Sequence, residues 1–270
     1  MTNKDYVLGV SDYELNRLRF QHGVWKEITD SFLDKLNITQ GLKVLDAGAG
    51  PGFVSADLLA RTGISGEVTA LEPSEMYVNY LKNYAAEKNI QNLKVIHGSV
   101  ETTELPEQYF DVIFARWVIS FVPDAGIFLD KLTRSLKPGG IISFMDYAYE
   151  GLALFPKGGA FDNMADAVRA YWVHGGGDPY IGAALPKMFR ERNLELKEYY
   201  PVAQCGGPSS GVFQWADKFF TVHIQQMVDL GVITQSEGDM MHKDWNNHKK
   251  DEDSVFISPT ITVISGQKKH

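Results

Sequence analysis

The sequence has almost no cysteine and no long apolar run. Among its 270 residues there is one cysteine, Cys205, which excludes an internal disulfide and a multi-cysteine metal site and indicates a reducing compartment. The most apolar stretch, residues 112–122, is too short to cross a bilayer and is interrupted by Arg116. The first residues lack the apolar segment of a signal peptide. We therefore expect a cytoplasmic protein without integral membrane association.

Positive charge is also in short supply. The chain carries 26 Lys and Arg residues against 34 Asp and Glu, which gives a formal net charge of −8. Such a surface disfavours nucleic acid or an anionic membrane as the main partner. Hydrophobic residues make up 44% and charged residues 22%, as in soluble globular proteins. We expect a partner that is a small molecule, and the composition does not indicate an oligomeric state.

Residues 1–150 show the alternating pattern of an α/β fold. Ser11 and Glu14 form an S-x-x-E capping box, and apolar residues at spacings of three and four then predict a helix to about Leu36. From Leu42 onward, short apolar runs alternate with helical stretches. The predicted strands are 43–46, 67–71, 93–97, 111–115 and 141–145, with a Pro-Gly turn at 137–140. Alternating strands and helices imply a parallel sheet with right-handed crossovers.

The remaining residues lose this rhythm, and we interpret them as a cap and a sheet edge. Two mostly helical insertions, 151–183 and 206–257, are predicted to form the cap. A helix at 184–192 and strands at 194–202 and 261–265 would complete the sheet as an antiparallel pair. The predicted fold class is α/β: a Rossmann-like doubly wound sheet of about seven strands, mostly parallel with an antiparallel edge, plus a helical cap. We expect one domain over 1–270, with the following parts: an N-terminal helical cover at 1–41, a cofactor-binding half-sheet at 42–150, the two cap insertions, and closing helix and edge strands at 184–205 and 258–270.

A glycine-rich loop, Asp46-Ala47-Gly48-Ala49-Gly50-Pro51-Gly52, follows the first predicted strand. Such a loop lets the backbone approach a ligand where a Cβ would collide. The dinucleotide fingerprint G-x-G-x-x-G requires a third glycine where this sequence has Phe53, and no Gly-Lys-Ser/Thr follows, as a P-loop would need. A nicotinamide-dependent oxidoreductase is therefore the weaker of the cofactor hypotheses.

The loop resembles the first motif of class I S-adenosylmethionine-dependent methyltransferases, acidic-x-Gly-x-Gly-x-Gly. The segments 105–113, 121–124 and 136–140 follow the same family pattern, most closely that of the branch with the ubiquinone and menaquinone biosynthesis methyltransferases. The resemblance covers roughly 42–147. It implies S-adenosylmethionine as cofactor, S-adenosylhomocysteine as product, and methylation of a small molecule. A non-catalytic S-adenosylmethionine-binding protein remains an alternative.

Candidate cofactor contacts follow from the resemblance, except Glu72, which the strand pattern also supports. Glu72 ends the second predicted strand, where a carboxylate can accept hydrogen bonds from ribose hydroxyls. The family places the adenine near the residues that follow, and Ser99 stands where the family usually has Asp. A weaker resemblance of residues 6–25 to a cofactor-covering helix adds two residues. The expected cofactor-binding residues are Tyr6, Gln21, Asp46, Ala47, Gly48, Gly50, Gly52, Glu72, Pro73, Met76, Ser99, Val100, Arg116 and Trp117.

Methyl transfer depends mainly on alignment and exclusion of water, and a general base helps only if the acceptor arrives protonated. The catalytic candidates are His22, Asp146, Tyr147 and His174. A buried histidine, a structural cap and a solvated turn are the competing interpretations of His22, Asp146 and His174 respectively. No residue spacing indicates a metal site. The cap sequence is rich in aromatics, so we expect a pocket for an apolar or aromatic acceptor between the cap and the sheet edge.

Overall fold

The computed structural model describes residues 12–270, so Tyr6 and the capping-box residue Ser11 lie outside the described residues. A seven-stranded sheet has the order β3-β2-β1-β4-β5-β10-β7. The strands in that order are Leu93–His97, Glu67–Glu72, Lys43–Ala47, Phe110–Arg116, Leu136–Ala148, Thr260–Lys268 and Leu194–Val202. The first five are parallel, and β10 is antiparallel to both of its neighbours. The predicted fold class is confirmed.

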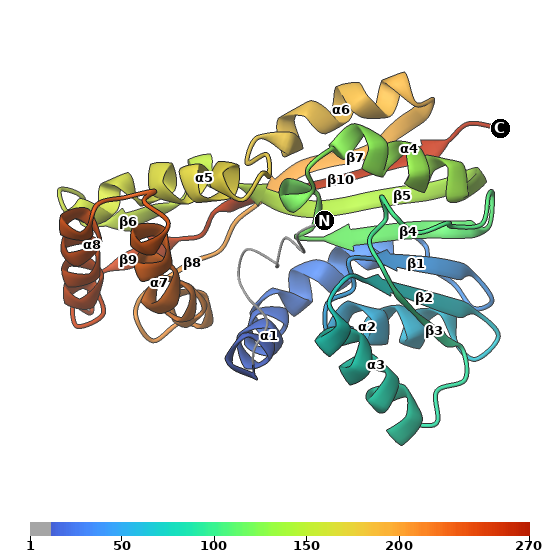
Figure 1. Cartoon of the computed structure of the whole chain (residues 1–270), viewed down its shortest axis with the longest axis horizontal. Helices are drawn as coiled ribbons and strands as arrows, with labels where there is room; N and C mark the ends of the chain where they lie inside the picture. The colour runs from blue at the N-terminus through green and yellow to red at the C-terminus, as the bar shows by residue number, and fades with distance from the viewer. Residues whose placement is uncertain (1–11) are drawn as a thin grey trace.

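Helices cover both faces of this sheet (Figure 1). One face carries α1 (Asp12–Lys35), α2 (Phe53–Thr62) and α3 (Glu75–Glu87), and the other carries α4 (Ala125–Ser135) and α6 (Ile181–Glu191). In β4, Val112 and Phe114 point to the first face, whereas Ile113 and Ala115 point to the second. Burial on both faces explains why the strands read as continuous apolar runs.

The cap lies beyond the carboxyl ends of β4 and β5 (Figure 1). It contains α5 (Met164–His174), α7 (Gly211–Asp229) and α8 (Gln235–His248), and α8 begins with a capping box of Thr234 and Glu237. Stacked and edge-on aromatic rings form its centre, with Phe213 and Trp245 at 4.6 Å between ring centroids and Phe161 and Phe220 at 4.9 Å. The cap therefore has a packed aromatic core of its own.

The structure differs from the predicted pattern in two details. The insertion 206–257, expected to be mostly helical, also contains β9 (Val255–Ile257), which pairs with β6 (Ala153–Phe155) and β8 (Cys205–Gly206) in a second, three-stranded sheet. Residues 137–140 were expected to form a turn before a strand. They lie within β5, as a bulge between the paired positions Leu136 and Ile141. Short 3₁₀ helices occur at Ile119–Phe121, Tyr149–Gly151 and Ala160–Asn163.

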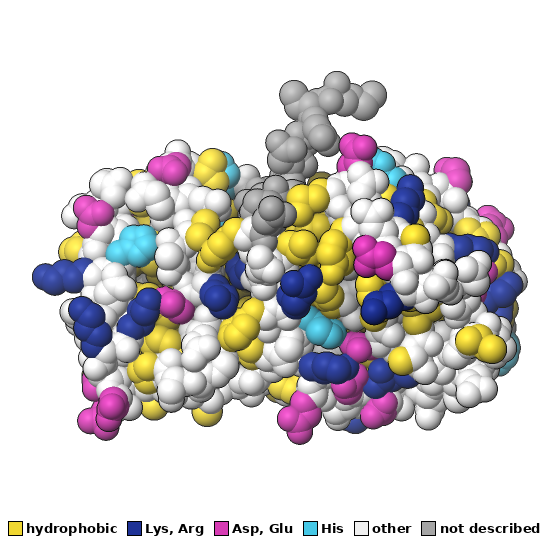
Figure 2. Space-filling view, turned by 90° about the horizontal axis from the view of Figure 1, so that it is seen from below, with side chains coloured by type: hydrophobic (Ala, Val, Ile, Leu, Met, Phe, Trp, Pro, Cys, Tyr) yellow, Lys and Arg dark blue, Asp and Glu magenta, His cyan; other side chains and the backbone are white. Residues whose placement is uncertain are grey.

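The exposed surface is mixed in charge. In Figure 2, acidic and basic side chains are interspersed across the face shown. None of the helices within residues 12–270 is long and apolar enough to cross a membrane.

Candidate cofactor and acceptor site

A cavity of about 1030 Å³ opens at the carboxyl edge of the sheet and continues into the cap. This is the upper end of the range for small-molecule sites, roughly 300–1,000 Å³. Most of the predicted cofactor-binding residues line it, namely Gln21, Asp46, Gly48, Gly50, Glu72, Pro73, Met76, Ser99, Val100, Arg116 and Trp117. Ala47 and Gly52 do not line it, because Ala47 is buried in β1 and Gly52 packs against α3.

The three glycines of the loop have different surroundings. Gly48, Gly50 and Gly52 all have positive φ, at 78°, 55° and 80°, which disfavours residues with a Cβ. A Cβ on Gly48 would collide with Val118, and one on Gly52 would collide with Leu81, whereas one on Gly50 would meet no atom within 4 Å. Only Gly50 thus has the open space expected of a ligand approach. The other two glycines allow the loop to pack against the protein itself.

Glu72 lies at the end of β2 with only 6% of its surface exposed. Its Oε2 accepts a hydrogen bond from the Gly50 backbone N–H at 2.7 Å, and its Oε1 accepts one from the Ser74 N–H at 2.8 Å. Burial raises the pKa of Glu72 to about 7, although the two backbone donors oppose the rise. The carboxyl group is held in place at the cavity wall and can ionise near neutral pH.

Asp46, at the end of β1, is buried and accepts a hydrogen bond from Ser55 Oγ at 2.6 Å. Burial raises the pKa of Asp46 to about 6, while Ser55 and the charge of Arg116 oppose the rise. Desolvation also lowers the pKa of Arg116, to about 10, with Asp46 as the main opposing charge. A buried carboxylate beside the glycine loop favours a ligand that carries positive charge.

His22 holds Arg116 rather than facing the cavity. Arg116 donates from Nη1 to Thr29 Oγ1 at 2.7 Å and from Nη2 to His22 Nδ1 at 3.1 Å. Because a guanidinium can only donate, His22 Nδ1 is the acceptor, and its Nε2 lies 3.5 Å from Asp57 Oδ2. Burial, and then the charge of Arg116, lower the pKa of His22 to about 4. These contacts match the competing interpretation, a satisfied neutral histidine, and do not support the catalytic one.

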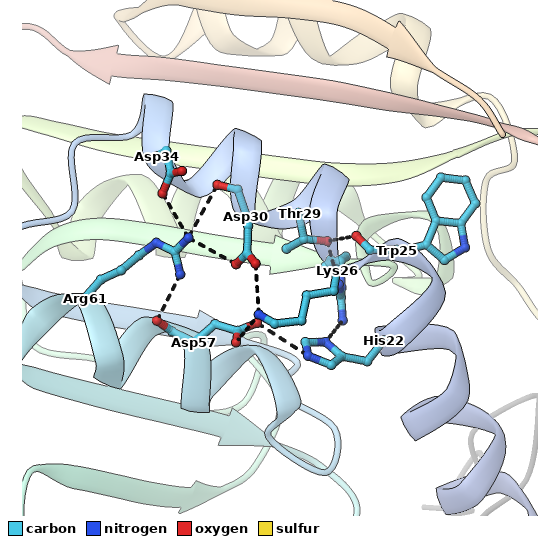
Figure 3. Close-up of polar contacts among 9 residues, drawn as sticks. His22, Trp25, Lys26, Thr29, Asp30, Asp34, Asp57 and Arg61 are labelled. Carbon is cyan, nitrogen blue, oxygen red and sulfur yellow. Dashed lines mark hydrogen bonds and ion pairs between the residues drawn. The ribbon is translucent and has the colours of Figure 1, made fainter. Parts of the chain in front are cut away.

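Ion pairs attach this part of α1 to α2 (Figure 3). Lys26 Nζ lies 2.9 Å from Asp30 Oδ2 and 2.8 Å from Asp57 Oδ1, and Arg61 Nη2 lies 3.1 Å from Asp30 Oδ1 and 2.9 Å from Asp34 Oδ1. Pairs at the surface contribute little individually, with a median of about 0–1 kcal/mol each. Their geometric effect is to fix this part of α1, and so His22, against α2.

Asp146 supports the loop that follows β4. Its Oδ2 accepts from the backbone N–H groups of Val118 and Ser120 at 2.9 and 3.2 Å, and its Oδ1 accepts from Ser120 Oγ and the Tyr147 N–H at 2.7 and 2.8 Å. The carboxylate is buried and does not line the cavity. It stabilises the turn in which Trp117 adopts a φ of 58°, so its contacts support a structural cap and not a catalytic group.

Tyr147 is the predicted catalytic residue that lines the cavity. Its ring stacks with Trp117 at 5.7 Å between centroids and with Tyr149 at 5.3 Å. Burial raises the pKa of its phenol well above the ordinary value, so the group is neutral near pH 7. His174 is exposed at the end of α5 and does not line the cavity, although its neighbour Gly175 does.

The cap side of the cavity is mostly aromatic. Its rings belong to Tyr149, Trp172, Trp215, Phe219, Phe220 and Phe256. His223 is 1% exposed, and its ring stacks on that of Phe219 at 4.0 Å between ring centroids. Burial lowers the pKa of His223 to about 4. Within residues 12–270, no group of three His, Cys, Asp or Glu side chains is arranged to hold a metal ion.

Arg17 was not among the predicted site residues, yet it lines the cavity. It forms a buried ion pair with Glu14, in which Nε and Nη2 each lie 2.7 Å from a carboxylate oxygen. The signal in the sequence was the spacing of Glu14, Arg17 and Gln21, which places the three on one face of a helix. Charged and polar side chains on one face of a helix, beside its apolar face, would have indicated that this face of α1 contributes to a site.

Comparison with known proteins agrees with this geometry. Residues 45–144 match the family described as a methyltransferase domain. Over 137 residues the chain is 28% identical to a demethylmenaquinone methyltransferase of Staphylococcus aureus, in an alignment covering 51% of this chain and 55% of the relative. The chain thus spans about half the length of the curated relatives it matches.

Two solved structures show the same fold. A putative methyltransferase from Bacillus halodurans is 20% identical with a TM-score of 0.59, covering 89% of this chain and 100% of the other. Phosphoethanolamine N-methyltransferase 2 of Haemonchus contortus, in complex with phosphomonomethylethanolamine and S-adenosylhomocysteine, is 12% identical with a TM-score of 0.63, covering 100% of this chain and 61% of the other. The loop motif and the match of residues 45–144 indicate a class I S-adenosylmethionine-dependent methyltransferase domain in this part of the chain, with S-adenosylmethionine as its cofactor, and the two solved structures share its fold.

Proposed function

We propose that this chain transfers the methyl group of S-adenosylmethionine to a small apolar or aromatic molecule held beneath the cap. The observation that carries the proposal is the continuity of the cavity. One end is lined by Gly50, Glu72 and Asp46, and the other by the aromatic side chains of the cap. A site of this size has room for a cofactor and an acceptor together.

The residues at the sheet edge fit the cofactor's functional groups. Glu72 can accept hydrogen bonds from ribose hydroxyls, and the apolar faces of Pro73 and Met76 can hold the adenine. Asp46 supplies negative charge for the ammonium group, and Arg116 supplies positive charge for the carboxylate. Gly50 allows close approach of the loop backbone.

When bound, the cofactor would supply a methyl group on a sulfonium; transfer would break the carbon–sulfur bond, leave that electron pair on sulfur, and form the new bond from an electron pair of the acceptor atom. The protein aligns the acceptor and excludes water. The stacked rings of Trp117, Tyr147 and Tyr149 provide a flat wall that leads from the strand ends into the cap. Tyr147 is neutral and can orient an acceptor by hydrogen bonding, and a proton lost by the acceptor passes to solvent or buffer.

Turnover is the direct test. The purified chain is incubated with S-adenosylmethionine and separate quinols, phenols and amines, and S-adenosylhomocysteine is measured by mass spectrometry. We expect acceptor-dependent release with at least one aromatic acceptor. Binding of S-adenosylhomocysteine without turnover on any acceptor would favour a non-catalytic binding protein. A nicotinamide dinucleotide recovered from the purified protein would favour the oxidoreductase alternative.

A further inference from the structure

Gln21 has an amide whose orientation is fixed by its neighbours. The side chain lies on α1 and is 3% exposed. Its Oε1 accepts hydrogen bonds from Arg17 Nη1 and Trp215 Nε1, each at 2.8 Å. A guanidinium and an indole can only donate, so the atom between them must be the amide oxygen. The amide nitrogen is therefore turned away from both partners.

That nitrogen has two N–H groups available for a ligand. Gln21 Nε2 donates to no residue within 12–270, and it is not among the fully buried side-chain nitrogen atoms that lack a hydrogen-bond partner. Because Gln21 lines the cavity and its amide oxygen is taken by Arg17 and Trp215, the nitrogen is the polar atom of this side chain that remains for a ligand in the cavity. A ligand that accepts from this nitrogen therefore gains a hydrogen bond that the described residues do not supply.

The position of Gln21 lies between the two halves of the site. Its partner Trp215 belongs to the cap helix α7. Trp25, one helical turn further along α1, contacts Trp215 at 5.5 Å and Trp117 at 6.2 Å between ring centroids. Trp117 follows β4, on the cofactor side. The free N–H groups thus lie near the junction across which the methyl group must pass.

We propose that Gln21, predicted from the sequence as a cofactor contact, is instead a fixed hydrogen-bond donor to an oxygen atom of the methyl acceptor. The acceptor is then an aromatic molecule bearing a carbonyl, phenol or carboxylate oxygen rather than a simple amine. A protonated amine can only donate, so it cannot pair with the amide N–H groups. This inference rests on the proposed function and names its acceptor class.

The test uses the full chain saturated with S-adenosylhomocysteine and three aromatic probes. These are 1-acetonaphthone, which has a ketone oxygen, 1-ethylnaphthalene, which lacks it, and 1-(1-naphthyl)ethylamine, which is a cation. Dissociation constants come from tryptophan quenching. We expect the ketone to bind about fivefold more tightly than the hydrocarbon, as one neutral hydrogen bond provides.

Gln21→Glu keeps the shape and the oxygen held by Arg17 and Trp215 but replaces the donor by an acceptor. We expect it to abolish the ketone preference and to favour the amine. Gln21→Met, which adds no charge, should make ketone and hydrocarbon equal. Gln214→Glu, at an exposed position of α7, is the matched control and should retain the wild-type preference. Thermal unfolding checks that each variant is folded.

A wild-type protein that does not distinguish ketone from hydrocarbon overturns the inference, as does an unchanged preference in Gln21→Met. If Gln21→Glu weakens binding of S-adenosylhomocysteine but not of methylthioadenosine, and the ketone preference survives, the oxygen is the cofactor's own carboxylate and the acceptor assignment is wrong. A wild-type protein that binds no S-adenosylhomocysteine overturns the proposed function, and the inference falls with it.

Discussion

Buried ionisable side chains have different surroundings in the cofactor half and in the cap. In the cofactor half, Glu72 and Asp46 lie at strand ends, and neighbouring N–H or O–H groups point at their oxygens. In the cap, His223 is stacked on a phenyl ring and donates its Nδ1–H to the Phe219 carbonyl at 2.8 Å. Burial raises the pKa values of the carboxyl groups and lowers that of the histidine, so each shift favours the neutral form.

This contrast separates two kinds of binding. The cofactor half offers ionisable groups with defined partners, as recognition of a charged, hydroxyl-rich ligand requires. The cap offers a large apolar surface of flat rings, which gives affinity but discriminates little between different apolar ligands. Specificity for the acceptor must then come from the few polar groups at the junction.

Replacing Glu72 should have the largest effect on the contrast. Hydrogen bonds to a charged group contribute roughly 1.5–3 kcal/mol, so we expect Glu72→Gln to weaken S-adenosylhomocysteine binding by about ten- to a hundredfold. Calorimetry gives the dissociation constant, with Glu87→Gln at an exposed position of α3 as the control. An unchanged dissociation constant in Glu72→Gln would show that the ribose does not bind there.

The same residue predicts a pH dependence of cofactor binding. With a pKa of about 7 in the free protein, Glu72 is protonated at pH 6, and binding to its carboxylate must displace that proton. Affinity should therefore rise by about tenfold from pH 6 to pH 8. The dependence should be much smaller in Glu72→Gln, and a flat wild-type profile would contradict the role given to the ionised group.

His223 provides the corresponding test for stability of the cap. Its folded pKa of about 4 lies below the ordinary value of 6.5, so the unfolded chain binds the proton more strongly and stability falls as the pH drops below about 6.5. Between pH 7 and pH 5 we expect a loss of about 2 kcal/mol that His223→Phe lacks. Asp46 and Glu72 act in the opposite sense, so urea unfolding must compare the two proteins at both pH values.

The smallest expected effect tests whether the cap binds the acceptor and the glycine loop binds the cofactor. Phe219→Leu removes one ring from the cap wall, and we expect KM for an aromatic acceptor to rise about fivefold, as a lost aromatic contact of about 1 kcal/mol gives. Binding of S-adenosylhomocysteine should be unchanged. Phe53→Leu, beside the glycine loop, should show the reverse pattern. Equal effects of both variants on both ligands would mean that the acceptor and the cofactor do not bind to separate parts of the cavity.

The sheet could be predicted from local pattern, because the strands are short apolar runs with helices between them. β7 was predicted at its observed bounds. The bulge in β5 could not be predicted, since Pro138-Gly139 has the composition of a turn and only pairing with β4 shows otherwise. The small cap sheet depends on contacts between distant segments, such as Leu154 with Phe256.

Site prediction was limited for a similar reason. A motif places a residue on a strand end, but the partners of its side chain come from elsewhere in the chain. Asp146 lies near the end of β5, as a catalytic group could, yet its four donors come from the Tyr147 N–H and from the loop after β4. Gly52 fits the cofactor motif, yet its missing side chain makes room for Leu81. Asp146 and Gly52 each lie at the strand end or loop where the sequence pattern places them, and the contacts in the folded structure indicate what each residue does there.

The insertion of β10 between β5 and β7 bears on how the protein is made. β7 pairs in the large sheet only with β10, which follows it by more than fifty residues and comes after α7 and α8. During synthesis from the N-terminus, β7 is therefore made before its pairing partner, and it cannot join the large sheet until residues 260–268 have been made. Until then β5 also exposes an open edge, which invites pairing with another chain.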